Sequence, residues 1–136
     1  MYKTALGLAL ITGLACSSMA SADRGGMTKP NLVTRQDVQG MPKGDHQQIS
    51  VLTAQFKPGD KTVYHTHRHP VSVYVIEGIF TLELEGREPV VVKAGEAFVE
   101  PPYVRMTGYN RSTTDALKVV IFFVAEPESP FLDLVK

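Results

Sequence analysis

The chain has 136 residues, of which 43% are hydrophobic. This length and composition suit a single domain built around one hydrophobic core. The 14 Lys and Arg residues balance the 14 Asp and Glu residues, so no long-range field favours nucleic acid or an anionic membrane surface. The composition therefore excludes partners that are chosen by net charge, and any ligand must be selected by a local site.

The first 22 residues differ from the rest of the chain. A positive start is followed by an apolar run over residues 5–15, and Ala20-Ser21-Ala22 offers a small-x-small cleavage site. The run is about half of the ~20 residues that are needed to span a bilayer. We therefore predict a cleavable signal peptide over residues 1–22, a periplasmic or secreted location, and no membrane partner after cleavage.

Cys16 is the only cysteine of the chain. Lipidation at this residue stays open as an alternative, although Gly13 stands where a lipobox normally carries a branched apolar residue. Cleavage after Ala22 leaves a mature chain without cysteine. The mature protein then has no disulfide, and no thiolate is present as a nucleophile or a metal ligand.

The mature chain begins with a polar segment and continues as a series of short strands. Residues 23–48 contain several glycines and prolines and show no sustained period, which predicts an N-terminal arm. Beyond this arm, runs rich in β-branched and aromatic residues alternate with turn signals and predict strands. The predicted strands cover residues 49–56, 62–67, 71–77, 79–85, 89–93, 97–100, 103–109 and 117–125. Because no run has a helical period, we predict one all-β domain over residues 49–136, closed as a sandwich or barrel.

The run over residues 79–85 shows the clearest alternation. Its apolar residues fall on one side of the strand, whereas Glu83 and Glu85 fall on the other side. The apolar side is expected to face the core. We interpret the two carboxylates as part of a solvated face rather than as a catalytic pair.

Three of the four histidines lie within residues 65–69. Side chains two residues apart on a strand project to the same face, so we expect His65 and His67 to converge. His69 is a third candidate, although Pro70 restricts the backbone of the residue before it. Imidazoles spaced in this way suit a first-row transition metal, with metal–nitrogen distances of about 2.0–2.1 Å. The alternative is a group of polar residues near a barrel rim that holds no metal.

The spacing of these histidines and of several glycines resembles the two sequence motifs of the cupin superfamily. The matching positions are Gly59, His65, His67 and Gly78 in the first motif, and Gly95, Pro101 and Asn110 in the second motif. The resemblance extends from about Ile49 to Ala125. It implies a small single-domain cupin with an export signal, folded as one double-stranded β-helix, or jelly-roll, barrel.

The chain departs from the cupin motifs at two positions that usually bind the metal. Val71 stands at the glutamate position of the first motif, and Met106 stands at the histidine position of the second motif. The resemblance therefore leaves His65 and His67 as the two retained metal ligands. Alternatively, Val71 and Met106 together form one apolar wall of a ligand pocket.

A third ligand would have to come from another residue if a metal is bound. His69 and Met106 are candidates, and Glu100 and Tyr103 are possible new contributors. The thioether of Met106 would slightly favour copper, because sulfur is a soft ligand. Without it, copper, iron, manganese, nickel and zinc are not distinguished. We also predict that Glu100, Tyr103 and Met106 line the ligand pocket.

Three functions stay open at this point. The lost ligand positions, and the absence of a clear general acid and base, favour a module that binds a small ligand without turnover. A second hypothesis is a metal-dependent enzyme of the oxygenase, isomerase or decarboxylase class, with substrate or oxygen in open coordination positions. A third is copper handling through histidine and methionine ligands. Since cupins carry out many chemistries, the fold does not choose among them.

The resemblance also implies a homodimer, because cupins commonly pair through their sheets. The segment over residues 129–136 is apolar enough to cross to a partner chain, and its apolar members are Phe131, Leu132, Leu134 and Val135. The alternative is a terminal strand that folds onto its own barrel.

Overall fold

The computed structural model describes residue 26 and residues 28–136. The predicted signal peptide over residues 1–22, with Cys16 and the cleavage site, lies outside the described residues. Residues 31–136 form one compact unit. Gly26 and residues 28–30 belong to a separate unit and have no regular secondary structure. The described residues contain no helix that is long and apolar enough to cross a membrane.

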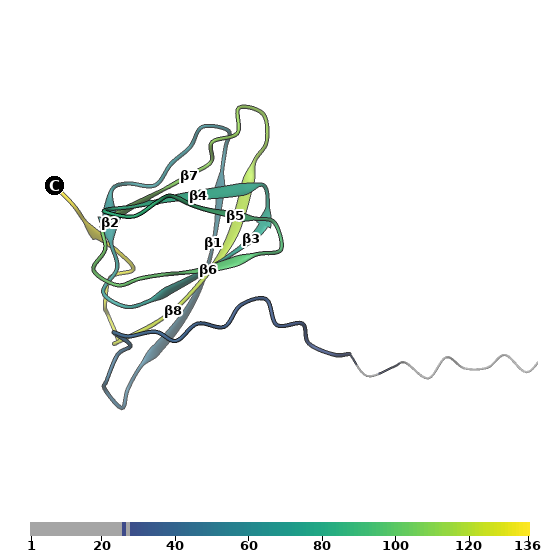
Figure 1. The fold of residues 1–136 in the computed structure, drawn as a ribbon. Helices are drawn as coiled ribbons and strands as arrows, with labels where there is room; N and C mark the ends of the chain where they lie inside the picture. The colour runs from purple at the N-terminus through teal and green to yellow at the C-terminus, as the bar shows by residue number, and fades with distance from the viewer. Residues whose placement is uncertain (1–25, 27) are drawn as a thin grey trace, which may run out of the picture. The chain divides into compact units, whose positions relative to one another are not determined.

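The compact unit is built from strands (Figure 1). They are β1 (Gln48–Phe56), β2 (His65–Thr66), β3 (Val71–Glu77), β4 (Ile79–Leu84), β5 (Val90–Lys93), β6 (Ala97–Glu100), β7 (Met106–Tyr109), β8 (Leu117–Ala125) and β9 (Asp133–Leu134). The strands predicted at 71–77, 97–100 and 117–125 are confirmed with the same bounds. The strand predicted at 62–67 is regular only over His65–Thr66, and the sequence pattern does not predict β9.

The strands form two antiparallel sheets (Figure 1). The first sheet has the order β1-β8-β3-β6, and the second has the order β5-β4-β7-β2-β9. The longest pairing joins β1 to β8, from Gln48 opposite Ala125 to Phe56 opposite Leu117. Because chain neighbours such as β2 and β3 lie in different sheets, the chain crosses repeatedly between the two layers. The all-β jelly-roll fold predicted from the sequence is confirmed.

The hydrophobic core lies between the inner faces of the two sheets. On β4, Phe80, Leu82 and Leu84 are buried, whereas Glu83 between them is partly exposed. The predicted apolar face of this strand is therefore confirmed, whereas Thr81, on the side of Glu83, is also buried. Removing a side chain of this size from water stabilises the fold by about 1.5–3 kcal/mol. Core residues of the other strands include Val71, Val73, Val75, Val92, Met106, Leu117, Val119, Phe123 and Ala125.

The two ends of the compact unit both pack on the barrel. Residues 31–47 contain no strand, but Pro42 within them is buried. At the other end, β9 pairs with β2 of the same chain, with Leu134 opposite His65 and Asp133 opposite Thr66. The C-terminal segment therefore adds a strand to its own barrel, which is the alternative that the sequence left open.

Candidate functional site

Two of the three clustered histidines lie inside the barrel. His65 and His67 are buried, with 4% and 1% of their surface exposed. The strand that carries His65, β2, lies between β7 and β9 in the second sheet. The two imidazole rings converge as their spacing predicts, with ring centroids 4.8 Å apart.

Backbone carbonyls determine which nitrogen of each ring carries the proton. Nδ1 of His65 lies 2.7 Å from the carbonyl oxygen of Val63, and Nδ1 of His67 lies 2.7 Å from that of Phe131. A carbonyl oxygen only accepts hydrogen bonds, so each Nδ1 donates and each neutral ring keeps an unprotonated Nε2. The two Nε2 atoms lie 3.2 Å apart. The two Nε2 atoms therefore point into the same small volume.

A buried carboxylate lies beside these nitrogen atoms. Oε2 of Glu100 is 3.0 Å from Nε2 of His67, and the Glu100 side chain is 6% exposed. Glu100 ends β6 and pairs directly with Val71 on β3. Directly paired residues present their side chains on one face of a sheet. Glu100 therefore lies beside Val71, the position where the first motif usually carries a glutamate.

The electrostatics of this group depend on burial and on the short distances between its polar atoms. Burial lowers the pKa of His65 below its usual value, and the hydrogen bond to the carbonyl of Val63 opposes this effect. Neutral His65 therefore keeps its Nε2 lone pair available. One carboxylate and two lone pairs at such short range repel one another unless a proton or a metal ion lies between them. The arrangement of the three side chains is therefore compatible with a proton or a cation between them.

The three polar side chains lie at the wall of a cavity of about 130 Å³. Most of the other lining is apolar and comes from both sheets and the C-terminal segment: Ala54, Phe56, Thr62, Val73, Phe80, Leu82, Gly108, Val119, Ile121, Phe131 and Leu132. An apolar cavity with a few convergent polar groups is the usual form of a small-molecule site. An apolar cavity of roughly 150 Å³ accepts benzene, so this one has room for a molecule of about six non-hydrogen atoms.

Comparison with known proteins identifies the family. The sequence model of the family described as Cupin domain matches residues 52–123, which is more than half of the chain. The chain belongs to the cupin family. No curated protein matches the chain significantly.

Solved structures agree with the cupin fold. A structure described as a DMSP lyase has a TM-score of 0.56 and 14% identity, and the match covers 65% of this cupin and 44% of that chain. A cupin-like protein from Thermotoga maritima has a TM-score of 0.55 and 19% identity, with 64% of each chain covered. An RmlC-like cupin from Methanocaldococcus jannaschii has a TM-score of 0.51 and 25% identity, with 75% of this cupin and 90% of that chain covered. This cupin spans less than two thirds of the first two chains, and these likenesses show the fold.

The donors of this cupin fit a transition metal in their chemistry and pairwise spacing. Two ligands that bind one metal at 2.0–2.1 Å lie about 2.9–3.4 Å apart. The distances of 3.2 Å between the two Nε2 atoms and 3.0 Å from His67 to Glu100 agree with this range. However, among residues 26 and 28–136 no three or more His, Cys, Asp or Glu side chains are arranged so that they could hold a metal ion. Nε2 of His67 is the atom shared by the two short distances.

The third clustered histidine lies away from the cavity. Nδ1 of His69 lies 2.7 Å from the carbonyl oxygen of Gly40, and its Nε2 lies 2.5 Å from Oε2 of Glu126. Both ring nitrogens therefore have partners from the N-terminal arm and from the residue after β8. The structure does not bring His69 to His65 and His67, in keeping with the restraint that Pro70 places on the backbone before it.

Met106 and Tyr103, which the sequence also suggests as site residues, are placed differently from the histidines. Met106 is fully buried in the hydrophobic core and pairs with His65 in the ladder between β2 and β7, but the cavity lining does not include it. Tyr103 has a positive φ of 60° and is 73% exposed. Its backbone N–H donates to the carbonyl oxygen of His67 at 2.7 Å. Tyr103 therefore supports the site through its backbone.

Phe131 is a site residue that the sequence pattern does not reveal. It lies 64 positions after His67, yet its carbonyl oxygen accepts the hydrogen bond from Nδ1 of that histidine. Its ring packs against the ring of His67, with centroids 5.0 Å apart, and against the ring of Phe123 at 5.2 Å. The apolar character of the C-terminal segment is the only signal in the sequence, and it does not say where the segment docks.

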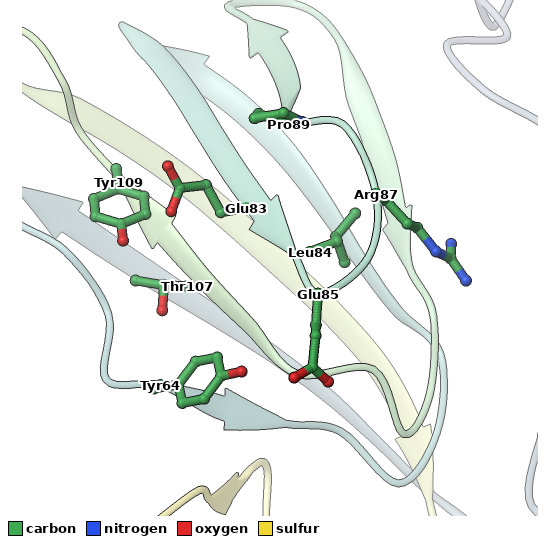
Figure 2. A pocket seen from close by; sticks show the side chains of 8 residues that line it. All are labelled: Tyr64, Glu83, Leu84, Glu85, Arg87, Pro89, Thr107 and Tyr109. Atoms are coloured by element: carbon green, nitrogen blue, oxygen red, sulfur yellow. The ribbon is translucent and has the colours of Figure 1, made fainter.

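A wider groove, of about 450 Å³, lies on the outer face of the second sheet. Figure 2 shows its lining, which includes Tyr64 and Tyr109 as well as Glu83 and Glu85. Arg111 pairs with Glu83, and Arg105 pairs with Glu85. The four charged side chains are about half exposed, so each pair contributes little to stability. This face has the solvated charges that the sequence predicts for it.

Proposed function

We propose that this cupin binds one small, largely apolar molecule in its barrel cavity and that a single transition-metal ion on His65, His67 and Glu100 anchors the molecule. One observation carries the proposal: at the wall of an apolar cavity, Nε2 of His67 lies 3.2 Å from Nε2 of His65 and 3.0 Å from the buried carboxylate of Glu100. The exported location predicted from residues 1–22 is part of the proposal.

The ligand set favours some metals over others. Two imidazoles and one carboxylate are the protein ligands of many catalytic zinc sites and of non-haem iron(II) sites. The slight preference for copper depends on Met106 as a ligand, and Glu100 replaces this soft sulfur with a hard oxygen. The proposal therefore favours zinc or iron(II). When bound, such a metal supplies a Lewis acid that attracts an oxygen donor of the ligand.

The cavity limits the kind of ligand. Its volume of about 130 Å³ suits a molecule of about six non-hydrogen atoms. Phe56, Phe80 and Leu82 line it, so most of the molecule must be apolar. One oxygen donor, such as a carboxylate or a hydroxyl group, would face the metal. We propose a small carboxylic acid or alcohol as the ligand class.

Metal content tests the proposal directly. We expect the exported protein, purified without a chelator or a metal-binding tag, to hold about one equivalent of one transition metal in elemental analysis. The double variant His65→Ala/His67→Ala should lose it, whereas His46→Ala, which removes an exposed histidine, should keep it. A wild-type protein that is free of metal and takes up neither zinc, iron(II), manganese, nickel nor copper would contradict the proposal.

The substitution Glu100→Gln tests whether Glu100 binds the metal or only packs inside the barrel. The amide can donate a hydrogen bond to Nε2 of His67, so the metal-free barrel should keep its stability while a charged metal ligand is lost. We expect metal affinity to fall by more than the ~10–100-fold that loss of an outer-shell partner costs. Isothermal titration of the metal-free protein with Zn²⁺ measures this change. Glu83→Gln in the outer groove is the matched control, and equal affinities of the two variants would show that Glu100 is not a ligand.

A metal-dependent enzyme is the second candidate, and the number of protein donors favours it. Three protein ligands leave a coordination position for substrate, as in catalytic rather than structural metal sites. The likeness to DMSP lyase structures concerns the fold. Incubating the metal-loaded protein with small carboxylic acids, and following them by NMR, distinguishes the candidates. A binding protein returns each acid unchanged, whereas an enzyme converts one of them.

A further inference from the structure

The C-terminal segment, residues 129–136, lies against the part of the barrel that carries the histidines. Figure 1 shows the C-terminus beside β2. The strand β9 within this segment pairs with β2, and Leu134 lies opposite His65 in the ladder. The backbone N–H of Val135 also donates to the carbonyl oxygen of Tyr64 at 3.1 Å. The segment is thus attached to the backbone on both sides of His65.

Side chains hold the segment in the same place. Asp133 accepts two hydrogen bonds from the guanidinium of Arg68, both at 2.8 Å, in a bidentate pair. The ring of Phe131 packs between the rings of His67 and Phe123. Leu132 lines the cavity. The segment therefore closes one side of the cavity while it contacts a histidine of the candidate site.

We propose that the C-terminal segment is a positioning element for the metal site. By docking, it places the carbonyl oxygen of Phe131 on Nδ1 of His67 and so directs Nε2 of the same ring at Glu100. The inference rests on the proposed function for the identity of the cation. The effect on the imidazole itself does not depend on any metal.

His65 provides a comparison within the same molecule. Its Nδ1 donates to the carbonyl oxygen of Val63, which lies two residues away on the same stretch of chain. The tautomer of His65 is therefore fixed locally, whereas the tautomer of His67 is fixed by a residue 64 positions away. Loss of the segment should change His67 and leave His65 as it is.

Deleting residues 129–136 tests this difference. Long-range ¹H–¹⁵N NMR correlations of the imidazole rings report which nitrogen carries the proton, and the metal-free protein is used. We expect Nδ1 of each of the two histidines to carry a proton in the full chain. In the truncated chain, His65 should keep this tautomer while His67 gives a mixture of the two. A single Nδ1–H tautomer for His67 in the folded, truncated chain would overturn the proposal.

A charge exchange at the Arg68–Asp133 pair gives a second test that keeps the chain intact. Arg68→Asp and Asp133→Arg each bring two like charges together, and the double variant restores an opposite pair. We expect each single variant to release its metal to a chelator ~10–100-fold faster, the scale of an outer-shell effect, and the double variant to return toward the wild-type rate. Arg105→Asp, at the exposed pair with Glu85, is the matched control. Single variants that behave like this control, or a double variant that is not restored, would overturn the proposal.

The two proposals fail in different ways. A protein that takes up no metal, but whose His67 tautomer depends on the segment, contradicts the proposed function and supports the positioning role. A protein that binds metal equally well with and without the segment, with His67 unchanged, contradicts the positioning role alone. If the truncated chain does not fold, its amide spectrum collapses, and the tautomers of the single and double charge variants decide the question.

Discussion

The barrel cavity and the outer groove lie on opposite faces of the same sheet and differ in how their charged groups are satisfied. The groove has a volume of about 450 Å³, against about 130 Å³ for the cavity. In the groove, Glu83 and Glu85 are each paired with an exposed arginine. In the cavity, Glu100 is buried and contacts Nε2 of His67, which lies 3.2 Å from Nε2 of His65.

The comparison shows that volume is a poor guide to a functional site in this protein. Water and arginine already stabilise the carboxylates of the groove, so binding there would replace interactions that exist. In the cavity, Glu100 pairs with His67 in surroundings where an unpaired charge is expensive. A ligand that binds there would meet polar groups that are shielded from water, where electrostatic interactions are stronger. The predictions below test this difference, beginning with the largest expected effect.

The same substitution on the two sides of the barrel should have very different costs. Val71→Glu places a second carboxylate opposite Glu100 in the interior, and one uncompensated buried charge destabilises a fold by about 3–5 kcal/mol. Val91→Glu changes a residue of β5 that is 54% exposed, and the expected change is within about 0.5 kcal/mol. Urea unfolding of the metal-free proteins measures both. Equal midpoints for the two variants would show that the interior is not a low-polarity site.

Moving the carboxylate from Glu100 on β6 to the paired position of Val71 on β3 tests whether the second charge causes the loss of stability. The double variant Val71→Glu/Glu100→Val restores the glutamate of the first cupin motif and removes the second charge. Because Val71 and Glu100 are directly paired, the new carboxylate should lie close enough to His67 to bind the same metal. We expect the stability and the metal content of this variant to return toward those of the wild type. A double variant that stays metal-free would mean that the position of the carboxylate, and not only its presence, is required.

Met106→Ala should separate packing from ligation. Met106 is fully buried in the core, and removing such a side chain costs about 2–5 kcal/mol. Since Met106 does not line the cavity, metal affinity should stay within a factor of a few of the wild-type value. Met41→Ala, at a methionine that is 40% exposed, should change neither quantity. A large loss of metal with little loss of stability would instead identify Met106 as a ligand and favour the hypothesis of copper handling.

Local pattern was enough to predict most of the fold. Alternation and turn signals gave the strands of both sheets, and the period of two brought His65 and His67 to one face. Glu100 was recognised as a possible contributor because it ends an otherwise apolar strand. These features depend on residues that are close in sequence, where the geometry of a strand leaves few choices.

The rest of the site depends on contacts between residues that are far apart in sequence. The pairing of Val71 with Glu100 is set by the register of β3 and β6, and the contact of Phe131 with His67 spans 64 positions. No local period encodes such a register or such a docking position. Strand β9 has only two residues, which are too few to show alternation. The sequence therefore does not decide whether its segment pairs with a partner chain or with its own barrel.

The smallest expected effect concerns the two exposed ion pairs Arg68–Asp133 and Arg105–Glu85. The hydrogen bonds from Arg68, together with its charge, outweigh the opposing effect of burial and lower the pKa of Asp133 below its usual value. A carboxyl group with a lowered pKa in the folded state stabilises that state above its ordinary pKa, and this contribution is lost as the pH falls through the lowered value. The free energy of unfolding should therefore differ between the wild type and Asp133→Asn at pH 6, and the difference should vanish in strong acid.

Glu85→Gln, at the pair with Arg105 in the outer groove, is the matched control, because only Asp133 belongs to a segment that also holds His67. If the two substitutions gave the same small change in the free energy of unfolding at every pH, the ion pair between Arg68 and Asp133 would not contribute to docking of the C-terminal segment. Only the ring of Phe131 and the backbone pairing of β9 would then hold the segment on the barrel.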